Sequence, residues 1–186
     1  DSSIYSYTIE NNSNLNRFSG TDKLDNSKRL DLSLNIKNKI LNGTLWAAYE
    51  FTNNSNYHYM QGNEKKLSDL LGDLSLNKET YDTSYNFRFD LHDNYMKNQN
   101  IYFSYKNILG DYKLGYLDEK IKNEGTILSD SETLNYEFAS NKIFKYSTIS
   151  YKGLYDLKKS INTESGISYS YFDECFGLNI DFKRNS

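Results

Sequence analysis

Residues 81–91 read Tyr-Asp-Thr-Ser-Tyr-Asn-Phe-Arg-Phe-Asp-Leu, and two kinds of side chain alternate along this stretch. Every second residue is aromatic, Thr or Leu, while the residues between them are Asp, Ser, Asn and Arg. A period of two predicts a β-strand whose two faces meet different surroundings. Repeated segments of about ten such residues, separated by polar turns, are typical of the wall of an outer-membrane β-barrel.

The same alternation recurs from Lys28 to the end of the chain and predicts about ten strands. They are expected near 28–37, 44–51, 67–77, 81–91, 101–105, 112–116, 134–138, 143–157, 167–171 and 176–182. The predicted fold is all-β, an antiparallel up-and-down meander forming part of a transmembrane β-barrel over residues 28–186. Residues 1–27 are rich in Ser, Asn and Asp with weak periodicity, which predicts a loop or extended arm.

Connections are predicted from turn residues and charge. Asn42-Gly43 is a strong hairpin signal, and residues 92–94 predict another turn. The charged segment 118–130 predicts a loop. One helical alternative exists at 64–76, where leucines recur at a spacing of three to four residues.

Composition supports paired strands and excludes several classes of protein. The 186 residues include no proline, 18 Tyr and 10 Phe, and the hydrophobic fraction is only 37%. Proline is disfavoured in paired strands, and tyrosine suits strands and the aromatic girdles of barrels. No apolar run is long enough for a transmembrane helix. Interspersed charges with a net of −3 predict no nucleic-acid partner.

Catalytic and cofactor motifs are missing from the sequence. His58 and His92 are far from each other and from Cys175, the one cysteine, so no metal site is predicted. Phosphate-loop, dinucleotide and nucleophile-elbow motifs are absent. Carboxylates such as Asp82 and Asp90 share a strand face and are interpreted as polar lining. We therefore expect no enzyme, no catalytic residue and no cofactor, with a rim Ser–His pair at His92 as the minor alternative.

Three segments resemble those of a known family. Asn16-Arg17-Phe18-Ser19-Gly20-Thr21-Asp22-Lys23-Leu24 is similar to the NRFSGxDR motif of the lipopolysaccharide-assembly protein family LptD. Residues 171–178, Tyr-Phe-Asp-Glu-Cys-Phe-Gly-Leu, resemble the Y-x-D-E-C-x-x-x-L strand of that family, and 67–72 resemble its S-D-Y-V-G segment. Lys23 and Leu70 depart from the usual Arg and Tyr. The resemblance spans nearly the whole chain and implies the C-terminal part of the barrel, a piece of a longer precursor.

The resemblance implies a function without chemistry. A barrel of this family inserts lipopolysaccharide into the outer leaflet of a Gram-negative outer membrane. Its implied partners are lipopolysaccharide, membrane lipid, an LptE-like plug lipoprotein and an LptA-like periplasmic bridge protein. Cys175 is implied to form a disulfide with a cysteine outside these residues. The loop with Asn16, Arg17, Phe18, Ser19, Gly20 and Asp22 is implied to pack into the lumen. A self-contained small porin or adhesin barrel and a barrel-borne lipid hydrolase remain alternatives.

The alternation also assigns side chains to the two faces of the wall. Polar side chains are expected to face the lumen: Asp31, Asn35, Lys37, Ser84, Asn86, Arg88, Ser168, Ser170, Asn179, Asp181 and Lys183. Apolar side chains are expected to face lipid: Leu32, Leu34, Tyr85, Phe87, Phe103, Tyr151, Tyr169, Leu178 and Ile180.

Overall fold

The structure is a computed structural model that describes residues 9, 28–52, 66–123, 126–140 and 146–185. Its elements are ten strands: β1 Arg29–Lys37, β2 Leu41–Glu50, β3 Leu70–Asn77, β4 Tyr81–Asp90, β5 Tyr95–Lys106, β6 Gly110–Asn123, β7 Thr126–Ser140, β8 Ser147–Asp156, β9 Ile161–Phe172 and β10 Gly177–Asn185. The predicted loop at 1–27 lies outside the described residues, apart from Ile9. No helix of the described part is long and apolar enough to cross a membrane.

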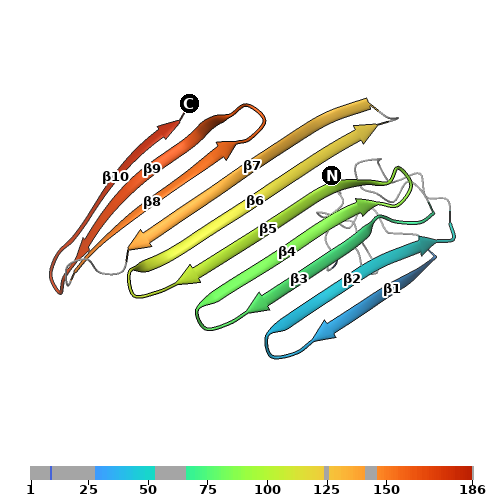
Figure 1. The fold of residues 1–186 in the computed structure, drawn as a ribbon, viewed down its shortest axis with the longest axis horizontal. Coiled ribbons are helices and arrows are strands. Elements are labelled where there is room, and N and C mark those ends of the chain that lie inside the picture. The colour runs from blue at the N-terminus through green and yellow to red at the C-terminus, as the bar shows by residue number, and fades with distance from the viewer. Residues whose placement is uncertain (1–8, 10–27, 53–65, 124–125, 141–145, 186) are drawn as a thin grey trace, which may run out of the picture.

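The ten strands form one antiparallel sheet in which each strand pairs with its neighbours in sequence (Figure 1). This order confirms the predicted up-and-down meander. The sheet is open: among the described residues β1 pairs only with β2, and β10 only with β9. The helical alternative at 64–76 is wrong, because β3 occupies its second half and pairs with both β2 and β4.

One end of the sheet carries a set of tight hairpins, at residues 38–40, 78–80, 107–109 and 173–176 (Figure 1). We call it the hairpin end. Asn38, Asn107 and Asp173 each accept two backbone N–H bonds from residues two and three positions later, which closes the turn. The turn predicted at Asn42-Gly43 is therefore wrong, since both residues lie inside β2, paired with Lys37 and Ile36.

The opposite end carries three β-bulges, and we call it the bulge end. The register shifts after Arg88 in β4, after Ile121 in β6 and after Leu154 in β8. The charged loop predicted at 118–130 is wrong, because β6 and β7 continue through it with Asp118 opposite Glu132. Bulges are frequent at the rims of barrels, where they end or redirect strand pairing.

The register gives the whole sheet one mainly apolar face and one mainly polar face. On the apolar face Leu74, Tyr85, Ile101, Tyr116, Leu134 and Tyr155 lie opposite one another from β3 to β8. Directly opposed residues of an antiparallel pair share a face. Every residue assigned to lipid above falls on this apolar face, and every residue assigned to the lumen falls on the other, the polar face.

Two glycines on the apolar face make room for large rings. A Cβ added to Gly72 would lie 2.0 Å from Cε1 of Phe87, its partner across the β3–β4 pair. A Cβ added to Gly153 would lie 2.4 Å from the hydroxyl oxygen of Tyr136, its partner across β7–β8. The rings lie over the glycines and cover backbone that a glycine leaves bare, an arrangement known to stabilise strand glycines.

Candidate functional site

The apolar face is a belt with a polar boundary near the bulge end. Along β6 it changes from Tyr112, Leu114 and Tyr116 to Asp118 without leaving the face. The Tyr116 hydroxyl donates to Oε1 of Glu132 at 2.9 Å, at the line where the character changes. Beyond that line, Lys158 forms ion pairs with Asp130 at 3.3 Å and Glu132 at 3.5 Å. Apolar and charged side chains are thus separated along the direction of the strands as well as between the two faces.

An aromatic row marks the belt near the hairpin end. Tyr81, Tyr105, Tyr112, Phe138 and Tyr151 lie opposite one another from β4 to β8, one per strand. The ring centroids of Tyr105 and Tyr112 are 6.2 Å apart, and those of Tyr112 and Phe138 are 5.0 Å apart. Aromatic girdles at the edges of an apolar band characterise transmembrane barrels. The sequence showed an excess of tyrosine, but the row itself depends on the register.

Large apolar side chains of the belt remain exposed. Leu32, Leu34 and Phe182 are 60%, 61% and 71% exposed, and none of the described residues forms a second layer over them. A single sheet cannot bury such a face within itself. Burial of this face therefore requires contact with something other than the described residues.

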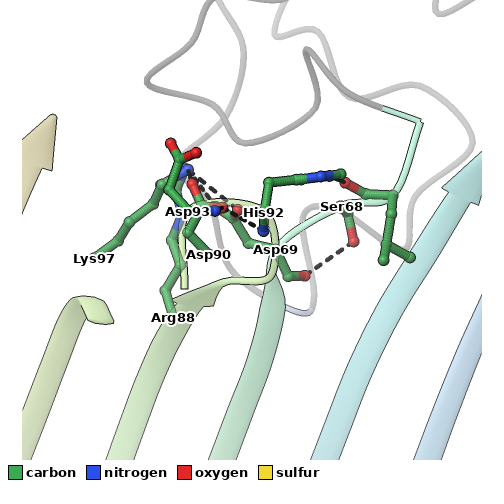
Figure 2. Close-up of polar contacts among 8 residues, drawn as sticks. Ser68, Asp69, Arg88, Asp90, His92, Asp93 and Lys97 are labelled. Carbon is green, nitrogen blue, oxygen red and sulfur yellow. Dashed lines mark hydrogen bonds and ion pairs between the residues drawn. The ribbon is translucent and has the colours of Figure 1, made fainter. Parts of the chain in front are cut away.

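The polar face carries a buried charge cluster at the bulge end, made of Asp69, Arg88, Asp90 and Lys97 (Figure 2). Asp69 accepts from Nε of Arg88 at 2.6 Å and from Nζ of Lys97 at 3.1 Å. Lys97 also pairs with Asp90 at 2.8 Å. The four side chains are 3–16% exposed, and their formal charges cancel.

A bulge creates this cluster. Asn98 pairs with Arg88 and Met96 pairs with Phe89, so Lys97 is the extra residue of β5. Strict alternation next to Asn98 would direct Lys97 to the apolar face, whereas the bulge turns it to the polar face. Asp69 itself precedes β3. The adjacent Ser68 donates its backbone N–H to the carbonyl oxygen of Ala48 and accepts the N–H of Ala48 at its hydroxyl, which fixes the end of the 51–69 connection to β2.

His92 lies beside the cluster (Figure 2). Its Nε2 contacts the backbone oxygen of Leu67 at 2.9 Å. The nearby Ser68 hydroxyl instead accepts from the N–H of Ala48 and donates to the carbonyl oxygen of Asp69. Among the described residues, then, His92 makes no Ser–His pair, and no group of three His, Cys, Asp or Glu could hold a metal. His58 lies outside them.

A small apolar patch interrupts the polar face between β2 and β3. Trp46, Ala48 and Leu71 are 2–5% exposed, and Ile9 packs against them. Trp46 and Ala48 lie on the polar face, opposite Ser33 and Asp31 of β1. Their burial was not predictable, because it depends on Leu71 opposite Trp46 and on Ile9 from a distant segment.

Cys175 lies in the turn between β9 and β10, at the hairpin end, and its side chain is exposed. The interpretation of its segment as a strand is therefore wrong at this position. Asp173 closes the turn by accepting the N–H of Cys175 at 2.9 Å and that of Phe176 at 2.7 Å, while the Tyr171 hydroxyl donates at 2.8 Å. The bonds from Cys175, Tyr171 and Phe176 hold the pKa of the Asp173 carboxyl below its usual value.

The remaining predicted site residues, Asn16, Arg17, Phe18, Ser19, Gly20 and Asp22, lie outside the described residues. No protein-family model and no curated protein matches this chain.

Proposed function

We propose that the sheet is a segment of the wall of an outer-membrane β-barrel, with its apolar face toward lipid and its polar face toward an aqueous lumen. The observation that carries this proposal is one register that keeps a mainly apolar face and a mainly polar face apart across all ten strands. Strands of 8 to 15 residues match the roughly 9–11 tilted residues that a barrel needs to span a bilayer. The aromatic row at one edge of the belt and the charged boundary at the other suit the two membrane–water interfaces.

A soluble sheet of this kind would need a second apolar layer. The polar face, with its charge cluster, does not supply one, and closing the barrel would leave the apolar face outside. In lipid every backbone group must be paired, so β1 and β10 must each gain a neighbour. In the larger barrel that we propose, strands outside these residues provide that neighbour.

We further propose that the parent barrel moves lipopolysaccharide into the outer leaflet of a Gram-negative outer membrane. The support is the resemblance of residues 16–24 and 171–178 to the LptD family, together with a polar face that suits sugars and phosphates. Translocation of this kind needs no catalytic group. A self-contained ten-stranded barrel is the second candidate, favoured by two open edge strands that run antiparallel to each other in the meander. Cysteines placed on β1 and β10 would form a crosslink within one chain only in that second case.

The natural Trp46 allows a direct test of the membrane assignment. Its indole Nε1 has no hydrogen-bond partner among the described residues, so Trp46→Phe removes no hydrogen bond that those residues make, and it gives a tryptophan-free background because Trp46 is the one tryptophan. In that background we expect Tyr169→Trp to be quenched by lipids brominated on their acyl chains, because Tyr169 lies on the apolar face. Ser168→Trp, one residue away on the polar face, should be quenched far less. Equal quenching at both positions would contradict the proposed orientation.

The second test concerns Cys175 in the parent protein. Its exposed position in a hairpin turn leaves the thiol accessible to a cysteine elsewhere, and an exported protein folds in an oxidising compartment. We expect Cys175→Ser to change migration in non-reducing electrophoresis and to slow delivery of lipopolysaccharide to the cell surface. Ser165→Ala, on the same hairpin, is the control. Unchanged migration and unchanged delivery in Cys175→Ser would remove the disulfide from the proposal.

A further inference from the structure

A hollow of about 390 Å³ opens on the polar face between β5 and β10, away from the charge cluster of β3–β5. Its charged lining residues are Lys113, Glu137, Lys152, Glu164 and Lys183, which sum to one positive charge. Asn135 adds a neutral hydrogen-bonding group. The hollow therefore carries charged groups with a slight excess of positive charge, in a chain that is acidic overall.

The lysines of the hollow lie in one row across the sheet, but their surroundings differ. Lys113 and Lys152 both lie opposite Glu137, one on each side, and Glu137 forms its ion pair with Lys113 at 2.9 Å. Lys152 and Lys183 flank Gly166, which pairs with both of them. Within the described part of the chain neither Lys152 nor Lys183 takes part in an ion pair. Two cations of the row thus keep their charge available.

Gly166 has no side chain, so the side chains of Lys152 and Lys183 can both approach the space above it. A Cβ added to Gly166 would lie 3.7 Å from Cγ of Lys183 and 4.0 Å from Cγ of Lys152. Both aliphatic stems therefore converge above the glycine from its two sides. Ammonium groups held near each other repel, and an anion placed between them relieves that repulsion. Lysine is a common phosphate ligand, because its point charge donates strong, charge-assisted hydrogen bonds.

We propose that this hollow binds a phosphate monoester group through Lys152 and Lys183. The geometry of the site stands without the membrane assignment; only the presentation of the phosphate on a lipid or glycolipid rests on the proposed function. Because the lining carries one net positive charge, loss of either lysine neutralises it, and loss of both makes it negative. The two lysines are therefore expected to act together.

The test is titration calorimetry of the full chain in a nonionic detergent. Inorganic phosphate, glucose 1-phosphate and dihexanoyl phosphatidic acid distinguish a free, a sugar-borne and a lipid-borne group. We expect millimolar or tighter binding of at least one of them, weakened about tenfold or more in Lys152→Gln/Lys183→Gln. Lys37→Gln, an exposed lysine on the polar face of β1, is the matched control and should bind like the unmodified protein.

Gly166→Glu provides an independent variant, because it places an acid between the two lysines and should also abolish binding. Absence of saturable binding, or equal binding by the unmodified chain and the double variant, would overturn the site. The proposed function fails separately: tryptophan quenching that is equal on both faces, with phosphate binding intact, would overturn the membrane assignment alone.

Discussion

Phe87→Arg is expected to destabilise the sheet in bilayers by about 2–4 kcal/mol, the range for an arginine near the midplane on the lipid face of a barrel. Phe87 lies inside the belt, its ring stacked with that of Tyr85 at 5.5 Å and covering Gly72. An arginine there must bring its charge into hydrocarbon or force water to follow it. Reversible unfolding by urea in lipid vesicles measures the loss.

Asn86→Arg is the matched control, one residue earlier on the polar face of the same strand. It should change the free energy of unfolding little, because its side chain stays in water. Phe87→Leu separates the loss of the ring over Gly72 from the cost of the charge. If Asn86→Arg and Phe87→Arg have the same effect, the sheet does not present one face to lipid.

The alternation was sufficient to predict the strands and their faces because it is a local property. One residue of register error would invert a whole strand, so the agreement of β1, β4, β9 and β10 with the predicted faces is a sensitive check. The predicted turn positions were wrong where a nearby side chain closes the turn by accepting backbone N–H groups. Asn42-Gly43 has ideal hairpin residues, yet the Asn38 side chain closes the turn earlier. Cys175 occupies a turn because Asp173 accepts two backbone N–H groups there.

The charged segment 118–130 was assigned to a loop because charge is usually excluded from strands with an apolar face. In the structure these charges find partners in neighbouring segments: Gln99 of β5 donates to Asp118 at 2.9 Å, and Lys158, in the turn after β8, pairs with Asp130. The same reason explains why the charge cluster was not predicted. Asp69 meets Arg88 and Lys97 only through the register of β3, β4 and β5, and Lys97 only through a bulge.

Asp69→Asn should lower the free energy of unfolding by about 3 kcal/mol or somewhat more, an effect comparable with that of Phe87→Arg. The substitution removes the carboxylate that two buried cations share. The Asp69 side chain is 3% exposed, so water cannot replace it. Loss of the Asp69 ion pairs should also speed hydrogen exchange at the N–H of the adjacent Ser68, which donates to the carbonyl oxygen of Ala48. Unfolding by urea gives the global cost, and exchange at Ser68 gives the local one.

Glu137→Gln is the control for this last prediction, because it breaks the Lys113–Glu137 pair, whose side chains are 39% and 40% exposed. Exposed pairs contribute about 0–1 kcal/mol, so that variant should unfold almost like the unmodified chain. In a double-mutant cycle, Asp69→Asn with Lys97→Gln should cost less than the two single changes together, because each removes the same interaction. Additive costs, or equal effects of Asp69→Asn and Glu137→Gln, would show that the cluster does not hold the 51–69 connection against the sheet.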